Sequence, residues 1–147
     1  MRPVIELIKK RQADGFWSLS PESSVFEALQ TLAAHDVGAL MVLEYDQLVG
    51  IFSERDYTRK VALAGKSSRD TKVRDIMTRA VLSVSAQTRT RECMALMSTK
   101  KIRHLPVLDG GKVIGMISIR DILDDIIADH EATISQLQSY IASWWQG

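Results

Sequence analysis

The heptapeptide Gly50-Ile-Phe-Ser-Glu-Arg-Asp56 decides the fold, because it returns 65 positions later as Gly115-Met-Ile-Ser-Ile-Arg-Asp121. Each copy places a glycine and two apolar residues before a serine, with an arginine and an aspartate close behind. Serine followed three residues later by aspartate is typical of a helix N-terminus, where side-chain oxygens accept hydrogen bonds from backbone N–H groups. The same residue types also suit a nucleotide, since hydroxyl and guanidinium groups bind phosphate and a carboxylate accepts ribose hydroxyls. Both interpretations stay open at this point.

The duplication extends well beyond this heptapeptide. Without a gap, residues 17–60 align with residues 82–125, and ten of the 44 aligned pairs are identical. The apolar positions between the identities also agree, as in Leu32 with Met97 and Val49 with Ile114. A chance alignment would not keep both the apolar pattern and the serine–arginine–aspartate motif, so we interpret the two halves as a true internal repeat.

Each copy predicts the same order of elements, β-α-β-β-α, because buried strands and amphipathic helices alternate at the same positions. A capping box of Ser24 and Glu27 marks one helix start, and the dipeptides Tyr45-Asp46 and Gly110-Gly111 mark the two hairpin turns. For the first copy we expect strands at 16–20, 37–43 and 48–52 and helices at 24–35 and from 53. For the second we expect strands at 81–85, 104–109 and 112–118 and helices at 89–99 and from 119.

The predicted fold class is α+β, with two repeats related by pseudo-twofold symmetry and additional helices at both ends. Apolar residues from Leu123 to Trp144 recur at steps of three and four, which predicts that the last helix overruns the repeat as one continuous seam. A partner subunit or the chain's own core could bury this seam, and so could bury Trp144 and Trp145. The predicted domains are an N-terminal helix (1–15), repeat one (16–64), a polar linker (65–78), repeat two (79–128) and a C-terminal helical extension (129–147).

The composition excludes some classes of protein but does not identify the function. The 147 residues are 46% apolar and 25% charged with a net charge of +1, so nothing in the balance demands nucleic acid or an anionic membrane. We expect a soluble cytoplasmic protein, because no apolar run approaches the ~20 residues of a membrane helix and no signal-peptide core is visible. Cys93 aligns with Ala28 on an apolar helix face, so a core position is favoured over a nucleophile. The three histidines His35, His104 and His130 do not have the spacing of metal ligands. The sequence shows no pairing of a nucleophile with a base, so we do not expect an enzyme.

With its two β-α-β-β-α units, each carrying the repeated heptapeptide, the chain resembles a pair of CBS domains, the family named after cystathionine β-synthase. The resemblance covers residues 16–128 and is strongest in the second copy, from Ile102-Arg-His-Leu-Pro to Ser118-Ile-Arg-Asp121. It implies a regulatory module in which AMP, ADP, ATP, NAD or S-adenosyl compounds bind in clefts between the sheets of the two repeats. It also implies a homodimer in many cases, and no metal is predicted.

The resemblance transfers specific roles to residues of this chain. Asp56 and Asp121 are implied to bind the ribose, and Ser53 and Ser118 to supply hydroxyls on the phosphate side. Arg55 and Arg120 are candidates for phosphate, with a solvent-facing position as an equal alternative. Arg103 and His104 resemble a family segment that reaches phosphate, whereas a surface arginine and a strand histidine are the alternative. The first copy departs from the pattern here, since Gly38 and Ala39 replace that pair and suit a base better than a phosphate.

Two functions follow from these observations. The first is an adenine-nucleotide sensor that acts in trans on an unidentified regulated protein. The second is a structural scaffold, a CBS pair kept for its dimer-forming surface with empty clefts. The second copy, with Arg103 and His104 beside its motif, is the better candidate for binding phosphate.

Overall fold

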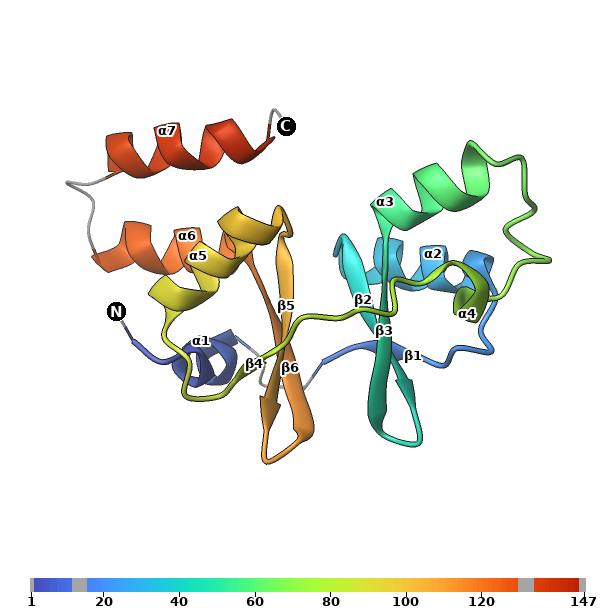
Figure 1. Ribbon diagram of the computed structural model, residues 1–147, viewed down its shortest axis with the longest axis horizontal. Helices are drawn as coiled ribbons and strands as arrows, with labels where there is room; N and C mark the ends of the chain where they lie inside the picture. Colours follow the sequence, from blue (N-terminus) through green and yellow to red (C-terminus); the bar gives the residue numbers. More distant parts are fainter. Residues whose placement is uncertain (1, 12–15, 130–133, 146–147) are drawn as a thin grey trace. The chain divides into compact units, whose positions relative to one another are not determined.

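The computed structural model describes residues 2–11, 16–129 and 134–145 of the chain. The chain separates into two compact units, which are described one at a time. The first-repeat unit consists of residues 16–82 with 111–113, and the second-repeat unit of residues 1–15, 83–110 and 114–147. The mixed α+β class and the two repeats are confirmed (Figure 1).

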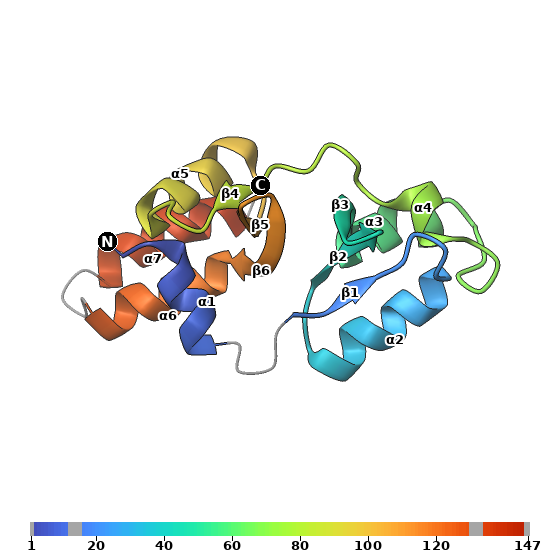
Figure 2. The ribbon, with the colours of Figure 1, turned by 90° about the horizontal axis from the view of Figure 1, so that it is seen from below.

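The first-repeat unit is built around a three-stranded sheet of order β1-β2-β3. Strand β1 is parallel to β2, and β2 is antiparallel to β3. Helix α2 lies alongside the sheet in Figure 2, and its N-cap Ser24 accepts a hydrogen bond from the Glu27 backbone N–H at 3.0 Å. The elements are β1 (Ser18–Leu19), α2 (Val25–His35), β2 (Ala39–Glu44), β3 (Gln47–Ser53), α3 (Glu54–Tyr57), a π-helix η1 (Thr58–Ala62) and α4 (Val73–Ile76).

The second-repeat unit repeats this plan with a sheet of order β4-β5-β6. Its sheet is joined by helices from both ends of the chain, which the first-repeat unit does not receive. The elements are α1 (Val4–Arg11), β4 (Val84–Ser85), α5 (Thr90–Lys100), β5 (His104–Asp109), β6 (Lys112–Ser118), α6 (Ile119–Asp129) and α7 (Ile134–Trp145).

Strand registers confirm the duplication at the level of single residues. Leu19 pairs with Val42 in the first sheet, and Val84 pairs with Val107 in the second, each residue lying 65 positions after its counterpart. The Gly110-Gly111 turn has the predicted backbone, with φ of 60° and 81°, and the Tyr45-Asp46 turn has the same geometry, with φ of 53° and 63°. Two successive positive φ values match the right-handed twist of the strands they connect.

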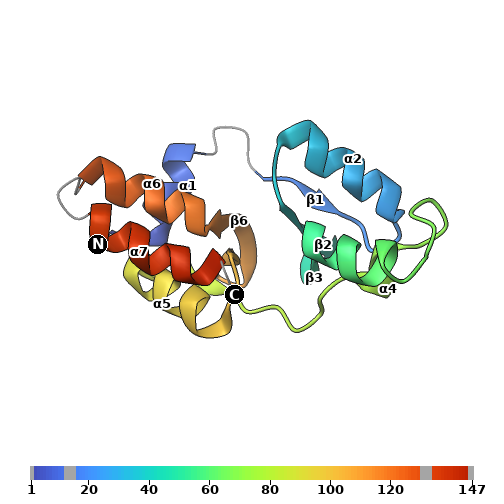
Figure 3. The ribbon, with the colours of Figure 1, turned by 90° about the horizontal axis from the view of Figure 1, so that it is seen from above.

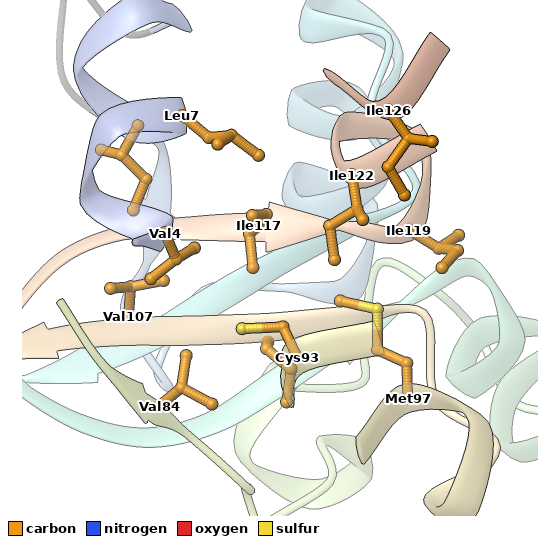
Figure 4. Packing of buried hydrophobic residues seen from close by; sticks show 12 residues of the cluster. Val4, Leu7, Val84, Cys93, Met97, Val107, Ile117, Ile119, Ile122 and Ile126 are labelled. Atoms are coloured by element: carbon orange, nitrogen blue, oxygen red, sulfur yellow. The ribbon is translucent and has the colours of Figure 1, made fainter. Parts of the chain in front are cut away.

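The N-terminal helix completes the core of the second repeat. The Val4 backbone N–H donates to the Thr88 carbonyl oxygen at 2.7 Å, and the Ile5 N–H donates to the Ala86 carbonyl oxygen at 3.1 Å. The Val4 side chain is fully buried. In Figure 4 the side chains of α1, β4, α5, β6 and α6 point toward one another around this residue. The buried members of this cluster are Val4, Leu7, Ile8, Val84, Cys93, Met97, Leu105, Val107, Ile117, Ile119, Ile122 and Ile126.

The predicted continuous C-terminal helix is wrong. Helix α6 ends at Asp129 and α7 begins at Ile134, while His130 lies outside the described residues. In a straight α-helix Ile119 and Ile141 would lie about 33 Å apart. Here the two residues line one pocket, and α7 runs alongside α6 and α5 in Figure 3.

The apolar seam is therefore buried against the chain's own core, which was one of the two alternatives left open. Ile141 is only 5% exposed, and Leu137 and Trp144 pack against the second-repeat cluster. The Trp144 ring also makes an edge contact with Tyr140 at 5.1 Å between centroids. The side chain of Trp145 lies outside the described residues.

The stretch that the sequence predicted as a polar linker contributes to the first core at its C-terminal end. Val73, Ile76 and Met77 are buried in the cluster that also contains Leu40 and Phe52. The stretch is also held at the surface, since Lys72 and Arg74 both pair with Glu22, Lys72 at 2.8 Å. The hydrogen bond from Lys72 is the main reason that the pKa of Glu22 is lowered, and Arg74 adds to it.

Candidate functional site

In the first repeat, Ser53 and Asp56 close a reciprocal capping box where β3 meets α3. The Asp56 backbone N–H donates to Ser53 Oγ at 3.1 Å, and the Ser53 backbone N–H donates to Asp56 Oδ2 at 3.0 Å. The Ser53 hydroxyl also donates to Asp56 Oδ2 at 3.0 Å. Because the strand ends in extended geometry and the helix begins at once, the two side chains satisfy backbone donors that the first helical turn leaves open.

The other oxygen of the Asp56 carboxylate is bound by two residues that the sequence analysis did not select. The Thr78 hydroxyl donates to Asp56 Oδ1 at 3.1 Å, and the Lys60 ammonium lies 2.9 Å from the same oxygen. Lys60 Nζ also donates to the Ile76 carbonyl oxygen at 3.0 Å. We call Ser53, Asp56, Lys60 and Thr78 the Asp56 cluster. Its members come from β3, α3, η1 and the segment after α4.

Some sequence signals could have pointed to the Asp56 cluster. Lys60 lies four residues after Asp56, the spacing at which opposite charges on a helix meet. Nothing local could reveal Thr78, because it reaches the site through strand-like pairing with β3: the Thr78 N–H donates to the Ile51 carbonyl oxygen at 2.9 Å and Ile51 N–H returns a bond of 3.0 Å. Gly50 allows this approach, since a Cβ at that position would lie 2.7 Å from Met77 Sδ and 3.0 Å from the Thr78 carbonyl oxygen.

Gly38 and Ala39 lie directly beside the same helix start. The Glu54 backbone N–H donates to the Gly38 carbonyl oxygen at 3.0 Å, and Ala39 pairs with Ser53 across the β2–β3 ladder. Four of the five first-repeat candidates therefore lie together, namely Ser53, Asp56, Gly38 and Ala39. The fifth, Arg55, is exposed to solvent, in agreement with the alternative that the sequence left open.

The second repeat forms the same capping arrangement where β6 meets α6. The Ser118 backbone N–H donates to Asp121 Oδ2 at 2.7 Å, and the Asp121 N–H donates to Ser118 Oγ at 3.2 Å. The Ile119 N–H donates to the Arg103 carbonyl oxygen at 2.9 Å, as Glu54 does to Gly38 in the first repeat. The backbone of Arg103 therefore lies beside the start of the helix that carries Asp121. Arg103 is exposed, and the next residue, His104, is half-buried.

Arg120, one residue before Asp121, lies beside helix α7. It lines a pocket of about 340 Å³ together with Ile119, Leu123 and Ile141, between α6 and α7. The other three lining residues are apolar, so the guanidinium is the charged group of an otherwise apolar recess. The Arg120 side chain is exposed to solvent.

Other candidates for chemistry have structural explanations. Cys93 is fully buried in the second-repeat core, and the loss of hydration raises the pKa of its thiol to about 11, with a smaller contribution from Glu92. His35 stacks on Trp17 with ring centroids 4.2 Å apart. Within the described part of the chain, no group of three or more His, Cys, Asp or Glu residues is arranged to hold a metal ion. None of the described helices is long and apolar enough to cross a membrane.

Comparison with known sequences identifies the repeats. A family model described as CBS domain matches residues 6–63 and 73–128. The chain is 38% identical over 139 residues to the CBS domain-containing protein CBSX3 of Arabidopsis thaliana, which is named a mitochondrial protein. That alignment covers 90% of this chain and 68% of the relative. Several other curated relatives are longer, and the chain spans between 21% and 54% of their length.

Solved structures show the same architecture. A protein with CBS domains from Burkholderia ambifaria MC40-6 is 43% identical, with a TM-score of 0.83 over 87% of this chain and 96% of that chain. CBSX2 of Arabidopsis thaliana, solved in complex with AMP, has a TM-score of 0.73 over 87% of this chain and 98% of that chain. Its identity in that complex is 24%, so this likeness concerns the fold.

Proposed function

The chain belongs to the CBS domain family, and from this premise we propose that it is a regulatory module that binds an adenine nucleotide. CBS-pair proteins are regulatory modules, and the expectation that this chain has no catalytic activity of its own follows from that membership. AMP is the first ligand to test, because the structural neighbour CBSX2 was solved with AMP. ATP, ADP and NAD share the adenosine group and belong to the same proposal.

The observation that carries the proposal is the serine–aspartate pair at the start of a helix in both repeats. In the second repeat, the Asp121 carboxylate lies within 2.7 Å of the Ser118 backbone N–H at the junction of β6 and α6. A carboxylate at such a junction can accept the 2′ and 3′ hydroxyls of a ribose.

Positive charge near Asp121 favours the phosphate end of the same ligand. We propose that Arg103, whose carbonyl oxygen accepts the Ile119 N–H, and His104, the first residue of β5, bind phosphate together with Ser118, and that Arg120 assists. Arginine can bind phosphate through two nitrogens, and a helix of 11 residues such as α6 adds a favourable dipole at its N-terminus. In the first repeat we propose that Ser53, Arg55 and Asp56 serve a second nucleotide, with Gly38 and Ala39 admitting the base.

Calorimetry with AMP, ATP and NAD tests this proposal. Asp121→Asn keeps a side-chain oxygen that can still cap α6, but it replaces an acceptor by a donor at the ribose. We expect AMP to bind in the micromolar range and Asp121→Asn to weaken the binding about tenfold, the equivalent of one charged hydrogen bond. Asp124→Asn, an exposed carboxylate on the same helix, is the matched control and leaves the affinity unchanged. If no nucleotide binds more tightly than millimolar, the proposal is lost.

Such a module would regulate another protein. We propose that nucleotide binding shifts the population between two arrangements of the protein and that an unidentified partner binds one of them better. The chain is also proposed to form a homodimer. Because Leu137, Ile141 and Trp144 pack on their own core, a dimer would form through the faces of the repeat helices.

The alternative proposal, a dimeric scaffold with empty sites, makes a different prediction in solution. A scaffold would show the same mass with and without AMP and no heat of binding, whereas a sensor would bind AMP. Light scattering of the full chain and of a chain ending at residue 129 would also show whether α7 contributes to any dimer. The cellular location stays a prediction: the sequence favours the cytoplasm, and the CBSX3 relative is named mitochondrial.

A further inference from the structure

A recess lies where helix α7 folds back over the first turns of α6. Its volume is about 340 Å³, and the described residues that line it are Ile119, Arg120, Leu123 and Ile141. Ile119 and Leu123 are one turn apart and share a face of α6, with Arg120 beside them, while Ile141 comes from α7. Small-molecule sites in proteins occupy roughly 300–1,000 Å³, so this recess has the size for a small ligand.

The apolar walls of the recess are held in place by the core of the second-repeat unit. Ile119 is 3% exposed and Ile141 is 5% exposed, so packing fixes both side chains without a ligand. Leu123 is half-buried and leaves part of its side chain open to the recess. Walls of this kind favour an aliphatic group, because each methylene that leaves water on binding raises the affinity up to about fourfold.

Arg120 adds one positive charge to these apolar walls. Its side chain is exposed, so the charge stays hydrated in the absence of a ligand. Asp124 lies four residues further along α6 and is also exposed, but within the described residues no carboxylate forms an ion pair with Arg120. A guanidinium binds a carboxylate through two parallel hydrogen bonds. The recess therefore combines an apolar surface with a group that prefers an anion.

The first repeat has the arginine without the recess. Arg55 corresponds to Arg120, but the positions that correspond to Ile119 and Leu123 are Glu54 and Thr58, and both are exposed. No described helix of the first-repeat unit corresponds to α7 either. The combination of an apolar wall with a guanidinium is thus a feature that the second repeat does not share with the first.

We propose that this recess binds a small amphipathic carboxylate, with the carboxylate on Arg120 and the aliphatic chain between α6 and α7. Both parts of the ligand are needed. A neutral alcohol lacks the group that the guanidinium binds, and acetate lacks the chain that Leu123 and Ile141 cover. Binding at the recess requires no nucleotide, so the second-repeat unit has a ligand site in addition to the one proposed for AMP.

The dependence of affinity on chain length is the first test. Butanoate, hexanoate and octanoate are titrated into the full chain without AMP, and NMR spectra of its labelled isoleucine and leucine methyl groups report the binding. We expect the affinity to rise up to about 15-fold for each added pair of methylenes until the chain fills the recess. Acetate and 1-octanol should bind at least about tenfold more weakly than octanoate. An affinity that does not depend on chain length, or equal binding of 1-octanol and octanoate, overturns the proposal.

A charge variant tests the role of the guanidinium. Arg120→Met keeps an unbranched stem and removes the charge, so octanoate should bind about tenfold more weakly while 1-octanol binds as before. Arg91→Met, at an exposed arginine of α5 in the same unit, is the matched control and leaves octanoate binding unchanged. Equal octanoate affinities of the two variants contradict the assignment of Arg120.

The same spectra locate the ligand. We expect octanoate to shift the methyl signals of Ile119, Leu123 and Ile141, and to leave those of Leu19 and Ile76 in the first-repeat core unchanged. Shifts of similar size in both units would mean that octanoate coats apolar surface without a site, and this overturns the proposal. Should Arg120→Met fail to fold, the chain-length series and the methyl shifts of the wild type still decide the outcome.

Discussion

The two repeats share one backbone and differ in what surrounds it. Leu19 with Val42 and Val84 with Val107 pair at equivalent positions, and the first N–H of each closing helix binds the carbonyl of residue 38 or 103. The residues four positions after the two aspartates nonetheless differ in charge: Lys60 follows Asp56, and Asp125 follows Asp121. A duplicated backbone can therefore carry different side chains around the same motif.

The two repeats also complete their cores in different ways. The second repeat uses α1 and α7 from the ends of the chain, with Val4 fully buried and Ile141 nearly so. The first repeat uses its own following segment, in which Val73 and Ile76 are buried. A small unit buries a smaller share of its surface than a large one, so the added segments contribute to both cores.

The largest predicted effect tests whether the first core stands on its own packing. Phe52 is fully buried, and its counterpart in the second repeat is Ile117. Phe52→Ala should lower the free energy of unfolding by about 3–5 kcal/mol, because a large cavity replaces the ring. Urea denaturation followed by circular dichroism measures it. Leu63→Ala, at a side chain that is 78% exposed, is the control and should change stability by less than about 0.5 kcal/mol. Equal effects of the two variants would contradict the assigned core.

The second prediction concerns the helix that only the second repeat possesses. Ile141→Asp places a charge where an isoleucine is 5% exposed, so α7 should leave the core with a loss of about 2–3 kcal/mol. Thermal unfolding measures the loss, and hydrogen exchange of α6 should rise with it. Ala142→Asp, at the exposed neighbouring position, is the control. If Ile141→Asp unfolds like the wild type, the placement of α7 on its own core is wrong.

A third prediction uses Cys93, whose counterpart in the first repeat is Ala28. The folded protein raises the pKa of this thiol from 9.0 to about 11, so the native state disfavours the thiolate. The contribution is fully present below pH 9 and is lost as the pH rises from 9 to 11, by up to about 2 kcal/mol. Cys93→Ala should remove this part of the alkaline destabilisation. The measurement is the stability of both proteins in urea between pH 8 and 11, and parallel curves would contradict a buried thiol.

The smallest predicted effect compares the two hairpin turns. Tyr45 holds a φ of 53° and is 94% exposed, whereas glycine holds the equivalent position in the second repeat as Gly110. A non-glycine residue in this region costs about 1 kcal/mol, so Tyr45→Gly should stabilise the protein by roughly that amount. Gly110→Ala should destabilise it to a similar extent. Chemical denaturation measures both, and the same sign for the two variants would contradict the turn geometry.

The sequence predicted the parts of this molecule that local patterns encode. The repeat at an offset of 65 residues predicted that the two units share one order of elements, and the adjacent glycines Gly110 and Gly111 predicted the second hairpin turn. The apolar seam from Leu123 to Trp144 led to the wrong prediction of one continuous helix. Its spacing of three and four is the same in α6 and α7, and such a pattern does not show whether the second helix packs back on the first. Four first-repeat candidates met as expected, but the role of Thr78 depends on pairing between distant segments and had no local signal.

The central proposal is that the serine–aspartate motif of the second repeat binds an adenine nucleotide. The most direct test is a crystal structure grown with about one equivalent of AMP per chain. We predict AMP against Ser118 and Asp121, with Lys60 still bound to Asp56. AMP bound first at Asp56, with the second repeat empty, would contradict the account.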